Sequence, residues 1–394
     1  MRTARTPRGT ARAALAALTA TAFAVLPATP AHADAIRARQ WGNEALNADE
    51  AWRTTKGEGI TVAVLDTGVD ETHPDLAGNV LPGKDFIGFG ARRGDRAWAR
   101  HGTAMAGIIA GHGHGPDGGD GVLGVAPEAK ILPVRVILEG SDKARAKARH
   151  TKGSALAQGI RWAVDQGADV INLSLGDDSE SAHAEAAEDA AVQYALAKGA
   201  VVVASAGNGG EKGDRVSYPA AYPGVIAVTA VDRYGTHASF STSRWYATVS
   251  APGVDVVIAD PDRKYYEGWG TSAASAFVSG AVALVRAAHP GLTPSQIKKL
   301  IADTARDSPQ GGRDDDKGYG TVDVAAAIEA GAKLRPADLK AATTGYGGPY
   351  FGPGPTPEEE HEEPPGPLAP VTGGVGALLV VTAAVLWRAG RRTE

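Results

Sequence analysis

Three side chains in this sequence could together attack a carbonyl group: Asp66, His101 and Ser272. A serine hydroxyl is a weak nucleophile, and it becomes reactive when an imidazole takes its proton during attack and later returns that proton to the leaving group. A carboxylate beside the imidazole fixes its tautomer and stabilises the imidazolium. These residue types predict acyl-transfer chemistry, although each residue taken alone could be a turn former or a helix cap.

The segments around these residues predict how they are positioned. Ser272 follows Gly270 and Thr271 and opens the apolar stretch 273–288, which indicates a buried helix. Free backbone N–H groups and the positive end of the helix dipole can hold an oxyanion there. Asp66 ends an apolar, β-branched run, and His101 stands at the head of a helix expected over 103–110.

Strand and helix patterns alternate through the middle of the chain. Nearly continuous apolar strands favour a parallel sheet covered on both faces, so we expect a doubly wound α/β fold with catalytic groups at the carboxyl ends of strands. The expected strands are 60–65, 130–136, 169–173, 200–204 and 225–229, and the expected helices are 103–110, 154–166, 184–198, 273–288 and 294–304.

Four segments of the chain resemble the subtilase family of serine proteases. They are 61–68, 101–111, 201–208 and 270–272, and they occur in the order that this family requires. The resemblance covers about residues 56–330 and implies the subtilisin-like three-layer αβα fold. It assigns Asp66, His101 and Ser272 to the catalytic triad and Asn208 to the oxyanion hole, where the amide would donate a hydrogen bond. The alternative to this role is that Asn208 is a turn residue in the left-handed conformation before Gly209.

The resemblance also suggests a substrate-binding strand. Residues 171–176, which include Ser174, Leu175 and Gly176, resemble the subtilase strand that pairs with the substrate backbone. Ser174, Leu175 and Gly176 are therefore expected to line the cleft by β-augmentation. The alternative is a core strand that ends in a turn, and the two interpretations are compatible.

The two ends of the chain have patterns typical of export and of membrane attachment. Arginines, a short apolar stretch and Ala31-His32-Ala33 predict a secretory signal peptide, against an N-terminal anchor as the alternative. An uncharged segment followed by Arg388, Arg391 and Arg392 predicts a membrane helix with a cytoplasmic tail. The predicted parts are 1–33 signal peptide, 34–57 N-terminal arm, 58–335 catalytic domain, 336–367 stalk rich in Pro, Gly and Glu, 368–387 transmembrane helix and 388–394 basic tail.

A sortase signal is the rival interpretation of the C-terminal end. Residues 369–373, followed by an apolar run and arginines, are similar to such a signal, although its first residue should be leucine. In that case the apolar segment would be removed rather than retained. The membrane-helix prediction places the protein in the cell membrane as a single-pass protein with its catalytic domain outside the cell.

Composition limits the partners and cofactors. A formal net charge of -5 gives no basic field for nucleic acid, and the absence of cysteine excludes disulfides and thiolate metal sites. We expect no cofactor. Two segments carry side chains that could bind a cation. For 112–114 with Asp117 and Asp120, we predict a flexible loop rather than a metal site. For 313–316, the alternatives are a structural calcium site and a solvated surface, and we predict the surface. The basic segment 143–152 is expected to be a solvated loop rather than a site for an acidic partner.

The arrangement of the whole chain resembles the mycosins, membrane-anchored subtilases associated with type VII secretion. This resemblance implies protein or peptide substrates and association with the membrane and with secretion components. The arm is expected to pack on the body, with Trp41 and Trp52 as core anchors. Residues 273–276 and Arg100 depart from the subtilase pattern, which puts turnover rate more than identity in doubt. The alternative function is a structural clamp of the secretion machinery whose proteolysis is secondary or lost.

Overall fold

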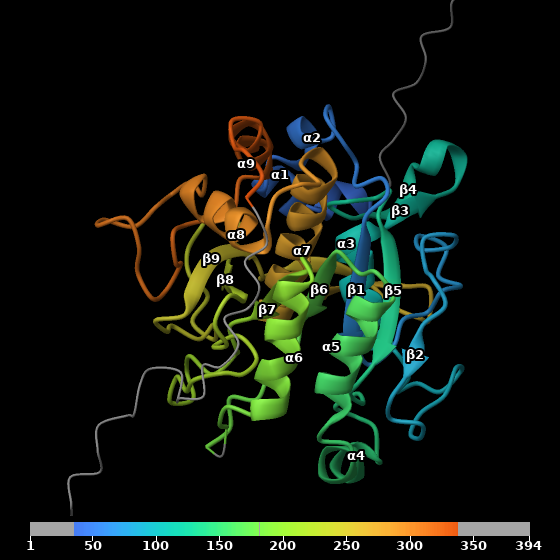
Figure 1. Ribbon diagram of the computed structural model, residues 1–394. Helices are drawn as coiled ribbons and strands as arrows, with labels where there is room; N and C mark the ends of the chain where they lie inside the picture. Colours follow the sequence, from blue (N-terminus) through green and yellow to red (C-terminus); the bar gives the residue numbers. More distant parts are fainter. Residues whose placement is uncertain (1–34, 181, 338–394) are drawn as a thin grey trace, which may run out of the picture.

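A parallel sheet lies at the centre of the computed structural model, which describes residues 35–180 and 182–337 (Figure 1). Its strand order is β2-β5-β1-β6-β7-β8-β9, and every neighbouring pair is parallel. The strands are β1 Thr61–Asp66, β2 Lys84–Asp85, β5 Lys130–Arg135, β6 Val170–Leu173, β7 Val201–Ser205, β8 Ile226–Val231 and β9 Ala247–Pro252. After β1 the chain first builds β2 and β5 on one side of β1 and then builds β6 to β9 on its other side. The direction in which strands are added therefore reverses at β1.

Helices cover both faces of this sheet. Alternate residues of β1 show the division: Val62 and Val64 pack in one hydrophobic cluster with α3 and α7, whereas Ala63 and Leu65 pack in another with α5 and α6. The structure therefore confirms the prediction of an α/β fold with a mostly parallel sheet. The helices of the body are α3 Arg100–Ala110, α5 Ala155–Asp165, α6 Ala186–Ala197, α7 Thr271–Ala288, α8 Pro294–Asp303 and α9 Val324–Gly331.

Two small antiparallel sheets lie beside the main one. The strands β3 His112–His114 and β4 Asp120–Leu123 form the first, and β10 Val256–Ala259 and β11 Tyr265–Gly268 form the second. The prediction of a flexible loop at 112–114 was wrong. The imidazole of His112 contacts the carbonyl oxygen of Ala77 at 2.9 Å and that of His114 contacts Asp75 at 2.6 Å, so both side chains hold the strand in place. A short 3-10 helix, Pro116–Gly118, joins the two strands.

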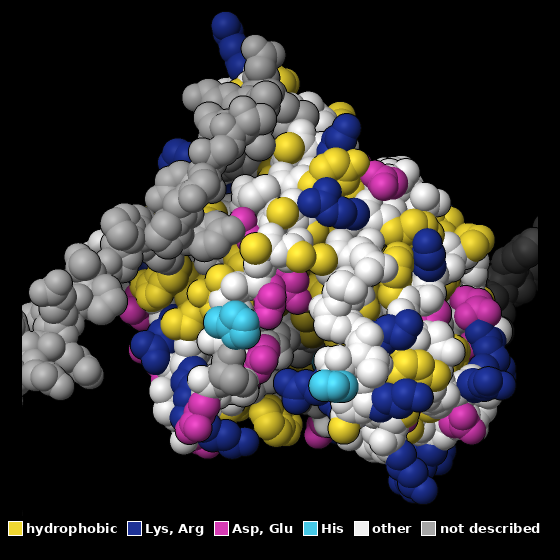
Figure 2. All heavy atoms as spheres, turned by 60° about the horizontal axis from the view of Figure 1, so that its bottom comes forward, with side chains coloured by type: hydrophobic (Ala, Val, Ile, Leu, Met, Phe, Trp, Pro, Cys, Tyr) yellow, Lys and Arg dark blue, Asp and Glu magenta, His cyan; other side chains and the backbone are white. Residues whose placement is uncertain are grey.

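The basic segment 143–152 is a helix rather than the predicted loop. Residues Arg145–Thr151 form α4, which projects at the bottom of Figure 1. Ala148 is its buried contact, and the Arg145 guanidinium donates to the carbonyl oxygen of Leu138. These two contacts attach a helix whose remaining side chains face water. Figure 2 shows the molecule with this end turned forward, where Lys and Arg side chains alternate with carboxylates.

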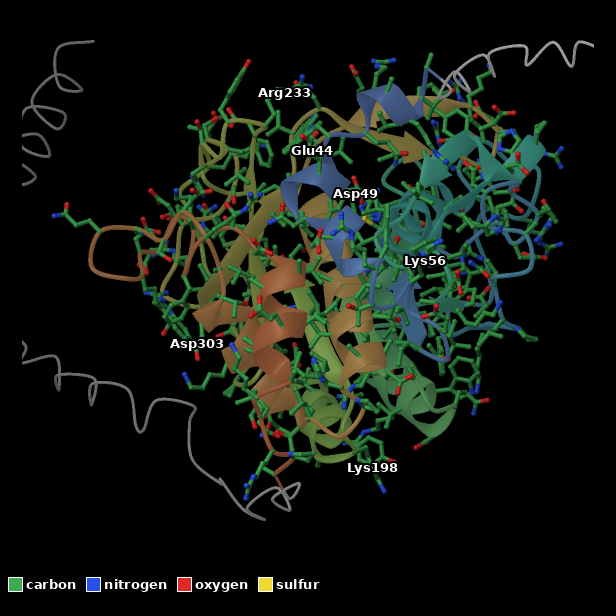
Figure 3. All side chains as sticks on the ribbon, turned by 90° about the horizontal axis from the view of Figure 1, so that it is seen from above. Glu44, Asp49, Lys56, Lys198, Arg233 and Asp303 are labelled. Atoms are coloured by element: carbon green, nitrogen blue, oxygen red, sulfur yellow. The ribbon has the colours of Figure 1, made fainter. Side chains whose placement is uncertain are left out.

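The N-terminal arm packs on the body through small helices. After a 3-10 turn at Arg37–Arg39 come α1 Gly42–Ala45 and α2 Ala48–Ala51, and Figure 3 looks down on them with the exposed Glu44 and Asp49 labelled. The fully buried anchor is Leu46, whose carbonyl oxygen accepts a hydrogen bond from Val324 at 3.0 Å. The prediction that the tryptophans are core anchors was wrong in part, because Trp41 and Trp52 are only half-buried and each donates its indole N–H to a backbone carbonyl oxygen.

Within the described residues, the one helix long and apolar enough to cross a membrane is Thr271–Ala288. Most of this helix, 83 %, is buried inside the body, so it is a core helix. The predicted signal peptide at 1–33, the transmembrane helix at 368–387 and the basic tail at 388–394 lie outside the described residues, as does the predicted stalk beyond residue 337.

Candidate active site

Asp66 is placed by β1, where it is the last residue of the strand and is fully buried. One carboxylate oxygen accepts the backbone N–H of Thr67 at 2.7 Å. Both oxygens lie close to Nδ1 of His101, at 2.9 and 2.8 Å. The carboxylate therefore fixes the proton on Nδ1 and leaves Nε2 of the imidazole as a potential base.

His101 is placed by the first turn of α3. Its backbone N–H donates to the Glu139 carboxylate at 2.8 Å, and the next residue, Gly102, lies so close to the turn after β1 that a Cβ there would be 2.0 Å from the carbonyl oxygen of Gly68. This close approach brings the start of α3 against the end of β1. Burial alone would lower the pKa of His101, but the charge of Asp66 and the hydrogen bond to it outweigh burial and raise that pKa above its ordinary value.

Ser272 is the second residue of α7 and is half-buried. Gly270 precedes the helix with φ 143, a conformation that L side chains rarely adopt, and it turns the chain from β11 into α7. The Ser272 hydroxyl donates to the carbonyl oxygen of Ser174 at 3.1 Å. Hydrogen bonds between a catalytic serine and histidine are often long without substrate and tighten when it binds, so this orientation is compatible with a nucleophile.

Asn208 follows β7 and is tied to the start of α7. Its amide oxygen accepts the backbone N–H and the hydroxyl of Thr271, both at 3.0 Å. Because these two donors fix which amide atom is the oxygen, the NH₂ group of this cleft-lining residue is left to donate elsewhere. The amide can therefore donate to an oxygen that lies near Ser272.

One cleft of about 660 Å³ joins the predicted residues. Its lining includes His101, Ser272 and Asn208 and also the three predicted substrate-binding residues Ser174, Leu175 and Gly176. Asp66 lies beneath the cleft, in contact with His101. All seven predicted residues thus meet at the carboxyl ends of β1, β6 and β7.

Sequence reasoning missed the charged sides of this cleft. Arg145, Arg149 and Lys152 line it with positive charge from the region of α4. Four carboxylates line it from other segments: Glu139, Asp177, Glu185 and Glu188. Burial raises the pKa of Glu188 above its ordinary value. Arg149 and Asp177 lie 3.9 Å apart across the cleft, a contact between residues that no local sequence pattern connects.

The departure from the subtilase pattern behind Ser272 has a visible counterpart. Ser275 replaces an apolar position with a buried hydroxyl, which donates to the carbonyl oxygen of Ser272 at 3.0 Å and lies 2.8 Å from the hydroxyl of Ser174. The second departure, Arg100, donates to the Asp260 carboxylate at 2.6 Å. Both residues have partners and leave His101 and Ser272 in the cleft.

No metal site accompanies these residues in the part of the chain that the structure describes. Across residues 35–180 and 182–337, no group of three or more His, Cys, Asp and Glu side chains is arranged to hold a metal ion. At 313–316, Arg313 contacts Asp315 at 3.0 Å, and the Asp314 carboxylate accepts the backbone N–H groups of Asp316 and Lys317. The prediction about calcium stays a prediction.

Comparison with known proteins agrees with this geometry. A model of the subtilase family, peptidase S8, matches residues 57–320. Thermitase of Thermoactinomyces vulgaris is 39% identical over 267 residues, which are 68% of this chain and 88% of thermitase. The thermophilic serine proteinase of Bacillus sp. strain AK1 is 42% identical over 269 residues, 68% of this chain, but the match spans only 61% of that proteinase, less than two thirds of its length.

A solved structure of a protease is also similar to this chain. The crystal structure of MycP1 from the ESX-1 type VII secretion system is similar with a TM-score of 0.65 and 31% sequence identity, over 79% of this chain and 90% of that one. The family match, the sequence relatives and the structural neighbour all cover the segment that holds the cleft. The chain belongs to the subtilase family of serine endopeptidases.

Proposed function

We propose that this protein is a serine endopeptidase in which Ser272 is the nucleophile, His101 the general base and acid, Asp66 its orienting carboxylate and Asn208 an oxyanion-hole donor. The observation that carries the proposal is the contact of 2.8 Å between His101 and the buried Asp66 at the wall of a cleft that also holds Ser272 and Asn208. The substrate is a polypeptide that pairs with the backbone of Ser174, Leu175 and Gly176.

The residues would act in a fixed order. His101 takes the proton from Ser272 as the hydroxyl oxygen attacks the substrate carbonyl, and the new oxyanion receives the amide N–H of Asn208 and the backbone N–H of Ser272. The protonated His101, stabilised by Asp66, then gives its proton to the leaving amine, and an acyl group stays on Ser272. Water completes the reaction by the same route in reverse.

Labelling by a fluorophosphonate probe tests this assignment. Wild-type protein should become labelled at Ser272, and Ser272→Ala should abolish labelling while thermal unfolding is unchanged. Ser239→Ala is the matched control, because Ser239 is an exposed serine outside the cleft lining and its loss should leave labelling intact. Labelling that persists in folded Ser272→Ala would overturn the proposal.

The proposal extends to location and partners. We propose that a signal peptide exports the chain, that 368–387 tethers it to the cell membrane with the catalytic domain outside, and that it works with type VII secretion. The similarity to MycP1 from the ESX-1 type VII secretion system supports the last part. Membrane fractionation with and without residues 368–394 tests the tether, and covalent attachment to peptidoglycan would instead support a sortase signal.

Secretion itself distinguishes the protease from a structural clamp. A strain carrying Ser272→Ala should export the same substrates uncut if proteolysis is the function of the protein. A strain that lacks the protein gives the comparison. If export fails in that strain, and if Ser272→Ala restores export without any uncut protein accumulating, the clamp is the main function.

A further inference from the structure

The side chain of Arg100 joins the segment that carries His101 to the segment that leads to Ser272. Its Nε donates to a carboxylate oxygen of Asp260 at 2.6 Å, across 160 residues of sequence. Asp260 directly follows β10 in the turn of the β10–β11 hairpin, and β11 ends at Gly268, shortly before Ser272. The ion pair therefore connects the two segments that supply the base and the nucleophile.

The hairpin is a closed unit with Asp260 at its turn and the approach to Ser272 at its base. The strands β10 and β11 are antiparallel and paired along their length. Beyond the pairing, the N–H of Gly270 donates to the carbonyl oxygen of Gly253 at 2.8 Å, which closes the hairpin directly before α7. The position of the turn is thus coupled through the paired strands to the position of the chain that precedes Ser272.

Asp260 is a buried and well-held partner for Arg100. It is 5% exposed, and its second carboxylate oxygen accepts the backbone N–H of Asp262 at 3.1 Å within the turn. The Arg100 guanidinium also lies over the ring of Tyr266, 5.7 Å from the ring centre, and the Tyr266 hydroxyl donates to Asp262 at 2.6 Å. Arg100 is therefore held both by the turn and by β11.

The start of α3 depends on such contacts because its backbone is strained. Ala99, directly before Arg100, is buried and has φ 53, in the left-handed region that is unfavourable for a residue with a Cβ. Two hydrogen bonds hold this turn besides the ion pair: the Thr103 hydroxyl donates to the carbonyl oxygen of Ala99 at 2.6 Å, and the N–H of His101 donates to Glu139 at 2.8 Å. A strained turn keeps its conformation only while its surroundings hold it.

The remaining packing of α3 on the hairpin is close but apolar. A Cβ at Gly107 would lie 3.3 Å from the Cβ of Ala259, so the helix and β10 approach each other through small groups. Apolar contact is non-directional, and it fixes the distance between two elements better than their position along each other. The directional bond from Arg100, in the first turn of the helix, fixes that position.

We propose that Arg100 is a positioning residue, whose ion pair with Asp260 holds His101 where it can take the proton of Ser272. The inference rests on the proposed endopeptidase function. A base must come within hydrogen-bond reach of the hydroxyl, and a misplacement of about 1 Å can lower the rate about 100-fold. Without the Arg100 charge, the turn at Ala99 can relax and the buried Asp260 loses its cationic partner. Arg100 is not among the described residues that line the cleft, so it acts through His101 rather than on the substrate.

The rate of labelling by a fluorophosphonate probe tests the proposal without a peptide. For the full-length protein in detergent, the rate constant should fall by about 10- to 100-fold in Arg100→Met, which keeps an apolar stem over Tyr266 and removes the charge. Arg100→Lys keeps the charge and should lose less than Arg100→Met. Asp260→Asn should also lower the rate, and combining it with Arg100→Met should add little, because the two residues act as one unit.

Peptide kinetics separates positioning from contact with the substrate. With a peptide p-nitroanilide, which has no amino acid after the cut, Arg100→Met should lower kcat by about 10- to 100-fold and change KM by less than about threefold. If Arg100 instead bound substrate residues after the cut, its loss would raise KM for longer peptides only and leave probe labelling unchanged. That result would overturn the proposal.

Controls separate this proposal from the function on which it rests. Arg39 forms an ion pair with Glu267 on the same hairpin but belongs to the N-terminal arm, so Arg39→Met should leave the labelling rate and kcat unchanged. Thermal unfolding reports folding, and Arg100→Lys and Asp260→Asn carry the test if Arg100→Met does not fold. A folded Arg100→Met variant that is labelled at the wild-type rate would overturn the role of Arg100 and leave the endopeptidase function standing. Absence of labelling in the wild type would overturn the function itself.

Discussion

Among the described residues, two histidines each lie within 3 Å of a fully buried aspartate, with nearly the same geometry. Nδ1 of His101 lies 2.8 Å from Asp66, and Nδ1 of His114 lies 2.6 Å from Asp75. Both carboxylates are 0% exposed, and the imidazoles are 34% and 38% exposed. Distance and burial therefore do not distinguish the pair that we assign to catalysis.

The neighbours of each pair do distinguish them. The Asp75 carboxylate also accepts the N–H of Val122 at 2.9 Å and the hydroxyl of Tyr265 at 2.8 Å, so it ties its own loop to the β3 and β4 hairpin and to β11. Among the described residues, the Asp66 carboxylate accepts, besides His101, the N–H of the adjacent Thr67, and His101 lines the same cleft as Ser272. Pairing with an imidazole is a common way to satisfy the charge of a buried carboxylate. Such a pair can take part in catalysis when a nucleophile and an oxyanion donor lie nearby.

Replacing Asp66 by asparagine should have the largest effect on catalysis. In Asp66→Asn the neutral amide no longer stabilises the imidazolium and favours the wrong tautomer of His101, so kcat/KM on a peptide substrate should fall by about 10⁴-fold. The loss of stability should be smaller than for the matched replacement at Asp75, because besides His101 the Asp66 carboxylate accepts the N–H of Thr67, a bond that the amide oxygen of asparagine can keep. An Asp66→Asn variant with more than a tenth of the wild-type kcat/KM would contradict the assignment.

The matched replacement at Asp75 should affect stability instead. In Asp75→Asn one carboxylate oxygen becomes an NH₂ group, which must face either His114 or the donors of Val122 and Tyr265, and the buried negative charge is lost. The free energy of unfolding should therefore fall by about 3 kcal/mol. Urea denaturation measures this change. The kcat/KM of the folded variant should stay within about threefold of wild type, since Asp75 lies outside the cleft lining. Loss of activity with unchanged stability would reverse the roles that we give to the two pairs.

The contrast between the pairs also shows what the sequence could reveal. Asp66 ends a recognisable strand, Asn208 follows another and Ser272 opens a long apolar helix, but it was the resemblance of these segments to the subtilases that joined these residues with His101 into one predicted site. Asp75 and His114 are 39 residues apart, and no periodicity connects them. Their contact depends on how two irregular segments fold against each other, which a single sequence does not encode locally.

Other omissions have similar physical reasons. The helix α4 carries one buried residue, Ala148, so it lacks the apolar periodicity by which a helix is recognised. The strands of the two small sheets have three or four residues each and lie among turns and glycines, where an alternating pattern is too short to recognise.

The smallest expected effect is a shift in the pH dependence of activity. Burial lowers the pKa of His101, whereas Asp66 and then Glu139 raise it, and the result lies above the ordinary value of about 6.5. Because the base must be neutral, kcat/KM should rise with pH through this raised pKa. The same shift acts oppositely on stability: the protonated form is favoured by folding, so its contribution is present below about pH 6.5 and is lost as the pH rises through the raised pKa.

Glu139→Gln should move the rise of kcat/KM toward lower pH, because it removes one of the charges that favour the imidazolium while a side-chain oxygen remains to accept the N–H of His101. Glu329→Gln removes an exposed carboxylate on α9 and should leave the profile in place. Measuring kcat/KM from pH 5 to 10 for the three proteins compares these shifts directly. The wild-type profile could instead rise below pH 6.5, or Glu139→Gln and Glu329→Gln could move it equally. Either result would contradict the inference that Asp66 and Glu139 raise the pKa of His101.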